Sequence, residues 1–120
     1  MKTIKRLVMS ILLGLGLSSG AYALTPASFP GGDEAQEAYI VANLRYPQVA
    51  KDNGIEGVVA VLFTVKIDGT IGNIKIKRMV DPDLENEAIR LVKQMPNWTP
   101  ATDNGTPVES TAEIDVAFTL

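Results

Sequence analysis

The chain has 120 residues, of which 46% are hydrophobic, a formal net charge of −3, and neither cysteine nor histidine. Without cysteine it has no disulfide and no thiol nucleophile, and without histidine it lacks the commonest general base and metal ligand. An acidic chain is also a poor candidate for binding nucleic acid or anionic lipid surfaces.

Residues 1–23 have the features of a secretory signal peptide. A start containing Lys2, Lys5 and Arg6 precedes an apolar run of 11 residues from Leu7 to Leu17, and Ala21-Tyr22-Ala23 fits a cleavage site. The sequence therefore predicts cleavage after Ala23 and an exported protein. The alternative is an uncleaved membrane anchor, but a spanning helix needs about 20 apolar residues. Cleavage would leave 8 Lys and Arg against 14 Asp and Glu, a net charge near −6.

The segment 24–32 (LTPASFPGG) contains two prolines and two glycines without periodicity. It is expected to form a linker or an extended lead-in to a single domain at 33–120. Asp33 is expected to cap a helix that runs to about Asn43, with Gln36 completing a capping box.

A second, short helix is predicted from the sequence PQVAKDN. Pro47 suits its first position, and Gly54 suits a left-handed C-cap. Val49 and Ala50 are expected to face inward, with Tyr46 packed beneath them.

The clearest predicted strand is 57–66, which is apolar on both faces and is therefore expected at the centre of a sheet. Asp68-Gly69 predicts a two-residue hairpin turn in which both positions have positive φ. The returning strand, at about 70–79, alternates apolar residues with Lys75 and Lys77, as an exposed outer strand does.

The main helix is predicted to begin at Asp81-Pro82-Asp83 and to end before Pro96. Its apolar residues recur on one face that should cover the sheet: Leu84, Ala88, Leu91, Val92 and Met95. An irregular stretch with Trp98 and a turn at Asn104-Gly105 follow. The last strand is expected from Glu109 to Leu120, with a buried face made of Ile114, Val116, Phe118 and Leu120.

Connection rules give these strands one arrangement. The first two strands form a hairpin, and a right-handed helical crossover then places the third strand parallel to the second. The sequence thus predicts an α+β domain with a small three-stranded sheet in the spatial order 2-1-3. The C-terminal strand then lies at an edge, where its backbone groups can bind another chain.

No residue pattern indicates an enzyme, a metal site or a cofactor site. The acidic residues Asp81 to Glu87 lie at a helix start, where they compensate the helix dipole. The acidic residues around Gly54 do not have the spacing of a calcium loop. Two features have alternative interpretations. Trp98 is a core residue or an aromatic flank of a peptide groove, and the cluster Lys75, Lys77 and Arg78 is a solubilising face or a contact for an acidic peptide.

Several motifs follow one another between Asp33 and Leu120: Tyr46-Pro47-x-x-Ala50, Gly54-x-x-Gly57, Val59-x-Val61-x-Phe63-x-Val65, Asp68-Gly69, the Leu84–Met95 helix, Pro96-x-Trp98-x-Pro100, Gly105-x-Pro107-Val108 and Phe118-x-Leu120. In their order and spacing they resemble the TonB C-terminal domain family, as does the FPGG lead-in.

The resemblance implies a three-stranded antiparallel sheet with helices packed on one face. It also implies that short N-terminal segments of outer-membrane transporters add as a strand to the last strand of the module. The implied partner-binding residues are Ile114, Asp115, Val116, Ala117, Phe118, Thr119 and Leu120, with Trp98 as a candidate flank. Family members couple the proton-motive force to transport, with inner-membrane motor proteins as further partners.

The chain differs from this family pattern in having an N-terminal segment with a predicted cleavage site and no long Pro-rich spacer. We therefore expect a periplasmic binding module that does not itself transmit force between the membranes. Two alternatives stay open: a membrane-anchored short energy transducer, and a homodimer joined through its sheet edges.

Overall fold

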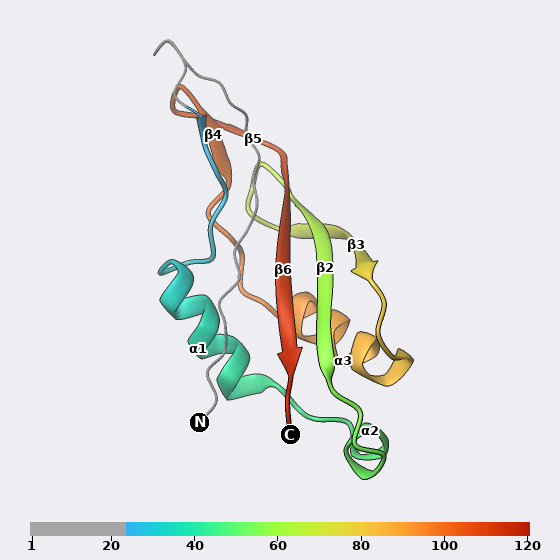
Figure 1. Cartoon of the computed structure of the whole chain (residues 1–120). Helices are drawn as coiled ribbons and strands as arrows, with labels where there is room; N and C mark the ends of the chain where they lie inside the picture. Colours follow the sequence, from blue (N-terminus) through green and yellow to red (C-terminus); the bar gives the residue numbers. More distant parts are fainter. Residues whose placement is uncertain (1–23) are drawn as a thin grey trace.

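The computed structural model describes residues 24–120, and the predicted signal peptide at 1–23 lies outside them. A three-stranded antiparallel sheet in the order β3-β2-β6 forms the centre of the fold (Figure 1). Its strands are β2 (Gly57–Val65), β3 (Ile71–Arg78) and β6 (Ser110–Phe118). The α+β class is confirmed, and this sheet has the order that the connection rules predict.

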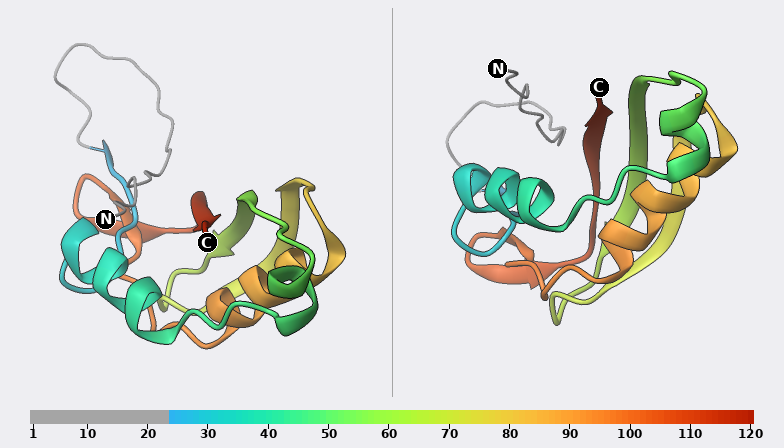
Figure 2. Two further views of the ribbon diagram at one scale, coloured as in Figure 1. Left: turned by 60° about the horizontal axis from the view of Figure 1, so that its bottom comes forward. Right: turned by 90° about the horizontal axis from the view of Figure 1, so that it is seen from below.

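The helices lie on one side of this sheet (Figure 2). They are α1 (Asp33–Asn43), α2 (Gln48–Asp52) and α3 (Pro82–Lys93). The carboxylate of Asp81 caps α3 by accepting hydrogen bonds from the N–H groups of Asp83 and Leu84, at 2.9 and 3.2 Å. The predicted apolar face of α3 is buried, and every residue named for it contributes to the core.

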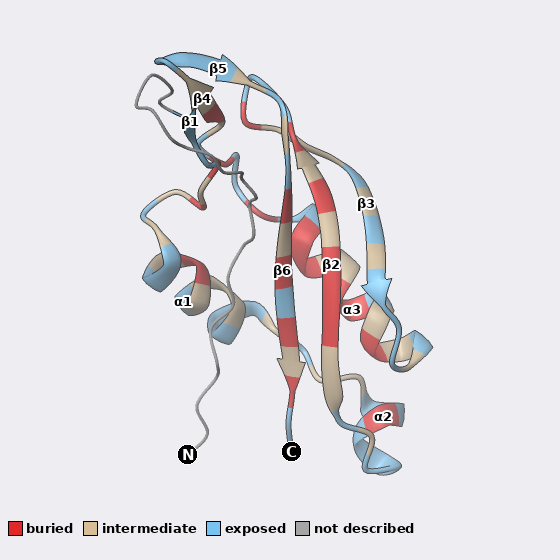
Figure 3. Cartoon of the chain, turned by 45° about the horizontal axis from the view of Figure 1, so that its top comes forward, coloured by how far each residue is buried: buried red, intermediate tan, exposed pale blue. Residues whose placement is uncertain are grey.

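The core fills the space between these helices and the inner face of the sheet. Figure 3 shows buried residues along β2, β6 and the sheet-facing side of α3. The side chains of Val59, Val61, Phe63 and Val65 on β2 are 0–1% exposed. The outer face of β2 differs from the expectation, because Val58 and Leu62 on it are only half-buried. No helix within residues 24–120 covers that face, so β2 is central without being enclosed on both sides by this part of the chain.

Helix α1 begins differently from the expectation. Its N-cap is Gly32, at φ 89°, and no side chain accepts a capping hydrogen bond. Asp33 is the first helical residue, and Gln36 is 4% exposed in the interior instead of reaching back to the cap. The predicted capping box is therefore wrong, because Gln36 faces the core.

The short helix α2 confirms one of the two inward-facing predictions. Ala50 is fully buried, but Val49 is 59% exposed. A helix of five residues turns only one narrow side to the core, and adjacent positions are about 100° apart around its axis. Pro47 is the N-cap instead of the first helical residue, and Gly54 has the predicted positive φ of 65°.

The β2–β3 hairpin has a longer loop than the sequence suggested. Lys66 and Thr70 flank the loop, and the N–H of Lys66 donates to the carbonyl of Thr70 at 2.9 Å. Only Gly69, at φ 89°, has the left-handed conformation. This is a three-residue connection with its positive φ at the last position, so the predicted two-residue turn is wrong.

A second sheet, in the order β1-β4-β5, was not predicted. It consists of β1 (Leu24–Thr25), β4 (Ala101–Asp103) and β5 (Thr106–Val108), with the predicted turn at Asn104-Gly105 between the last two. Ala27 and Phe29 are 8% and 6% exposed in the main core. The segment 24–32 is therefore part of the domain and not a free linker.

Candidate functional site

The candidate site is the free edge of β6. This strand pairs with β2 from Ser110↔Val65 to Phe118↔Gly57 without a register shift. It is the last strand in the order β3-β2-β6, and no residue from 24 to 120 pairs with its other side. Figure 1 shows β6 beside β2 on one flank, with α1 on the side of its free edge.

The hairpin fixes which backbone groups of β6 point to the free edge. The N–H of Lys66 points to β3, because it donates to Thr70. Backbone groups alternate sides along a regular antiparallel strand, so those of Val65, Phe63 and Val61 point to β6. The backbone groups of their β6 partners point back to β2, and the backbone groups of the intervening β6 residues point outward. The outward N–H and C=O groups belong to Thr111, Glu113, Asp115 and Ala117.

This alternation changes the predicted set of binding residues. Within the predicted range, Ile114, Val116 and Phe118 direct their backbone groups to β2, and their side chains are fully buried. Asp115 and Ala117 direct theirs outward. Thr111 and Glu113 have outward groups too, but the predicted range began after them.

The end of the predicted strand needs correction. Strand β6 ends at Phe118, so Thr119 and Leu120 lie beyond it. The side chain of Leu120 is 55% exposed instead of buried, and its N–H donates to Oε2 of Glu56 at 2.7 Å. The chain end is thus held beside the start of β2 by a carboxylate and not by core packing.

An aromatic contact supports the C-terminal half of β6 from below. The ring of Tyr46 meets that of Phe118 edge-on, with the centroids 5.6 Å apart. The Tyr46 hydroxyl donates to the carbonyl of Ile55, which holds the ring in place. Burial raises the pKa of Tyr46, and the carboxylate of Glu56 adds to this rise.

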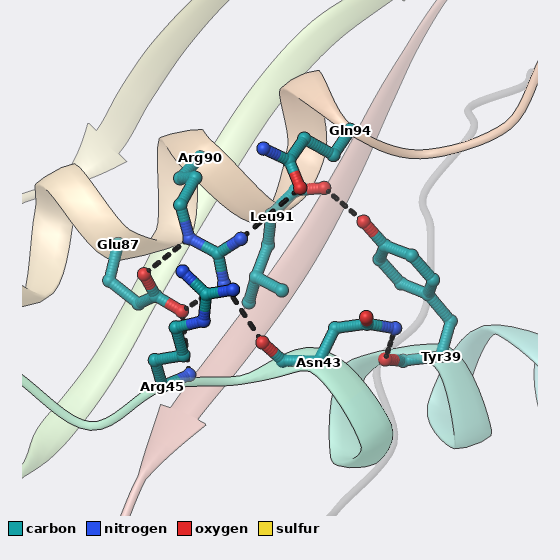
Figure 4. Close-up of polar contacts among 7 residues, drawn as sticks. All are labelled: Tyr39, Asn43, Arg45, Glu87, Arg90, Leu91 and Gln94. Atoms are coloured by element: carbon teal, nitrogen blue, oxygen red, sulfur yellow. Dashed lines mark hydrogen bonds and ion pairs between the residues drawn. The ribbon is translucent and has the colours of Figure 1, made fainter.

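A polar cluster fixes the segment that connects α1 and α2 to α3 (Figure 4). Glu87 accepts from the Arg45 N–H at 2.7 Å and from two N–H groups of Arg90 at 2.8 Å. Burial of Glu87 opposes its ionisation, but the hydrogen bonds from Arg90 and Arg45 and their positive charges outweigh it. The pKa of Glu87 is therefore below its ordinary value. Arg90 also donates to the Asn43 carbonyl, and Tyr39 donates to that of Leu91.

Trp98 is a core residue in this fold. It is 2% exposed, and its ring packs edge-on against Phe29 and Phe63 at centroid distances of 6.0 and 5.1 Å. Both of its N–H groups have hydrogen-bond partners. The backbone N–H donates to the Gly69 carbonyl, and the indole N–H donates to the sulfur of Met95. The burial favours the core interpretation over the groove flank.

The outer face of the sheet is polarised across its three strands. Lys75, Lys77 and Arg78 lie on β3 and are exposed, and Glu113 and Asp115 lie on β6. Lys77 reaches across β2 to Glu113 at 3.1 Å. Among residues 24–120 there is no group of three or more acidic side chains arranged to hold a metal ion.

A family model described as the C-terminal region of the Gram-negative bacterial TonB protein matches residues 42–120. The chain belongs to this family. The family membership that the sequence motifs indicated is confirmed, and proteins of this family are associated with the bacterial cell envelope. Within residues 24–120, no helix has the length and apolar character that crossing a membrane requires.

Relatives of this TonB C-terminal family member include two proteins from Helicobacter pylori, each called Protein TonB. The one from strain J99 is 32% identical over 77 residues, which are 63% of this chain and 26% of that protein. The one from strain 26695 is 43% identical over 44 residues, 37% of this chain and 15% of that protein. This chain thus spans about a quarter or less of these relatives.

A solved structure supports the same fold assignment. The solution NMR structure of the H. pylori TonB C-terminal domain matches with a TM-score of 0.54 and 27% identity. The match covers 70% of this chain and 76% of that one.

Proposed function

We propose that this domain binds extended segments of other proteins by adding them as a further strand at the free edge of β6. The supporting observation is the row of outward backbone groups on Thr111, Glu113, Asp115 and Ala117, which no other residue from 24 to 120 occupies. The regular register with β2 keeps this row straight over nine residues. Such an edge is a template for strand addition.

The other edge of the sheet is a weaker template. Strand β3 pairs with β2 through two register irregularities, and Asn73 within one of them has a positive φ of 49°. Irregularities of this kind twist an edge and interrupt its row of donors and acceptors. Exposed Lys75 and Lys77 add positive charge, which also discourages pairing. Binding is therefore assigned to β6.

The proposed partners are the short N-terminal segments of outer-membrane transporters, and the proposed location is the periplasm. Both rest on membership of the TonB C-terminal family and on the export features of residues 1–23. The proposed binding groups are the outward backbone groups of Thr111, Glu113, Asp115 and Ala117, of which Asp115 and Ala117 lie in the predicted range from Ile114 to Leu120. Trp98 is left out of the proposed site because it is buried. No catalytic step and no cofactor is proposed.

A titration with transporter N-terminal segments tests this function. Amide resonances are recorded by NMR while segment is added, and hydrogen exchange is measured on the complex. We expect the slowest new exchange at Glu113 and Asp115, because their outward N–H groups become bonded. Ile114 and Val116 serve as internal controls, since their N–H groups point to β2 already. Changes confined to β3 or α3 would contradict the proposal.

Two alternatives use the same domain differently. If residues 1–23 are not cleaved off and act as an anchor, the protein would be a membrane-anchored energy transducer that works with inner-membrane motor proteins. The mass of the protein recovered from the cell envelope distinguishes it from the cleaved form. The free edge of β6 could also pair with a second copy, and sedimentation at increasing concentration would then show a dimer.

A further inference from the structure

We infer that the β6 edge selects extended segments carrying Lys or Arg at two positions separated by one residue. This inference rests on the proposed strand addition and adds the chemistry of the partner. It concerns Glu113 and Asp115, which alternate with the buried Ile114 and therefore project from the outer face of the sheet.

The two carboxylates stand on the edge where a partner would dock. The backbone groups of Glu113 and Asp115 also point outward, so each would form a directly opposed pair with a residue of the added strand. Side chains in such pairs have Cβ atoms about 5 Å apart on the same face. The two opposed partner positions are separated by one residue, whether the added strand runs parallel or antiparallel.

Asp115 is the less compensated of the two acids. It is exposed and has no ion-pair partner among residues 24–120. Glu113 forms an ion pair with Lys77 of β3 at 3.1 Å, but this lysine is 55% exposed and the ion pair is correspondingly weak. A cation on an added strand would lie on the side of Glu113 opposite Lys77 and beside Asp115. The edge therefore offers negative charge at two adjacent outer-face positions.

The same charges act against pairing with a second copy. If two β6 edges pair antiparallel with the two copies of Ile114 opposite each other, Glu113 of each copy lies opposite Asp115 of the other. If they pair about Glu113 or Asp115, that residue lies opposite itself. Like charges directly opposite each other destabilise a strand pair. The edge thus favours a cationic segment of another protein over the β6 edge of a second copy.

The residue between the two cations is expected to be apolar. It would point to the helix side of the sheet, beside the row of Ile114 and Val116, whose side chains are fully buried. The chemistry of the preferred segment is therefore cation, apolar residue, cation, in extended conformation.

Three capped peptides with the sequence Thr-Val-X-Val-X-Val-Thr, in which X is Lys, Gln or Glu, test this inference. Their affinities for the protein are measured by fluorescence anisotropy at low ionic strength. We expect the Lys peptide to bind about fivefold more tightly than the Gln peptide, and the Glu peptide to bind most weakly. At about 1 M salt, where charges are screened beyond ~3 Å, the difference should vanish.

Variants assign the preference to the edge. Asp115→Asn should lower the preference for Lys over Gln by about half, and Asp115→Lys should reverse it. Asp52→Asn, which removes an exposed carboxylate from α2, is the matched control and should leave the preference unchanged. Equal binding of the Lys and Gln peptides overturns the charge preference and leaves strand addition standing. Binding of none of the peptides overturns both.

Discussion

The side chain of Glu87 on α3 accepts a 2.7 Å hydrogen bond from the backbone N–H of Arg45, a residue 42 positions earlier in the chain. Arg90 binds the same carboxylate and donates to the carbonyl of Asn43, which ends α1. One carboxylate thus joins the helix beneath the sheet to the segment that leads toward Tyr46 and the support of β6. Tyr46 directly follows Arg45, and its ring packs against Phe118 at the end of β6.

Glu87→Gln is expected to destabilise the domain. The Glu87 side chain is only 8% exposed, so water cannot make up for the lost charge, and Arg90 loses its anionic partner. Hydrogen bonds to charged groups contribute about 1.5–3 kcal/mol, and a loss in this range should appear in urea denaturation at pH 7. Glu113→Gln is the control, because its ion-pair partner Lys77 is 55% exposed and the pair should contribute at most about 1 kcal/mol. Equal losses in the two variants would contradict this assignment.

Stability is expected to fall in acid, in part because of Glu87. Its pKa in the folded protein lies below the ordinary value of 4.5. The stabilisation is therefore complete above pH 4.5 and is lost as the pH falls through the lower folded value. The difference between the denaturation midpoints of the native protein and Glu87→Gln should narrow as the pH is lowered from 7 to 3. A difference that stays constant over this range would show that ionisation of Glu87 does not matter.

Phe63→Ala is expected to cost about 3–5 kcal/mol, enough to unfold a marginal domain. The Phe63 ring is 1% exposed and contacts Trp98, so its removal leaves a cavity in the core. Leu62→Ala is the control at the adjacent position of the same strand. Leu62 is half-buried on the outer face and should cost about 1–2 kcal/mol. Thermal denaturation ranks the two variants, and an unchanged melting temperature for Phe63→Ala would reject its place in the core.

Gly69→Ala is expected to destabilise the hairpin by about 3 kcal/mol or more. A Cβ at Gly69 would lie 2.3 Å from the carbonyl oxygen of Trp98, and the residue also has a positive φ of 89°. Gly105→Ala separates these causes, because Gly105 has a φ of 84° but no atom of residues 24–120 comes within 4 Å of the added Cβ. It should cost only about 1 kcal/mol, from backbone strain alone. Equal costs in chemical denaturation would show that the contact with Trp98 relaxes freely.

Glu113→Pro and Ile114→Pro should separate binding from folding. The N–H of Glu113 points to the free edge, so proline there leaves the β2 ladder intact and removes one donor for an added strand. The N–H of Ile114 belongs to the ladder, and its side chain is fully buried. We expect Glu113→Pro to fold and to bind segments at least about tenfold more weakly, and Ile114→Pro to unfold. Circular dichroism and anisotropy measure the two effects, and a folded Glu113→Pro with native affinity would reject the edge.

Local patterns in the sequence were sufficient for the helices and the main sheet. Asp81 followed by Pro82 marks the start of α3, and the spacing of Leu84, Ala88 and Leu91 marks its buried face. The sequence was less informative where the chain contacts distant residues. Nothing near Leu24 indicates that β1 pairs with β4, because that pairing depends on where α3 returns the chain.

The candidate site was predicted as a range and not as a pattern. Alternation of side chains shows that Ile114 and Val116 are buried, but it does not show which edge their N–H groups face. The hydrogen bond between Lys66 and Thr70 and the register of β2 with β6 together decide this. Glu113 was therefore outside the predicted range, although its outward backbone and its carboxylate make it central to the proposals.

Periodicity, turn residues and connection rules were enough to predict the α+β class and the edge position of the last strand, and the order of the motifs indicated the family. The fold was needed to show that the backbone N–H of Asp115 points to the free edge while that of Ile114 points to β2, and that Phe29 belongs to the core. Helix and strand periods are local properties of the chain. Register and the packing of distant segments are settled only when the elements meet.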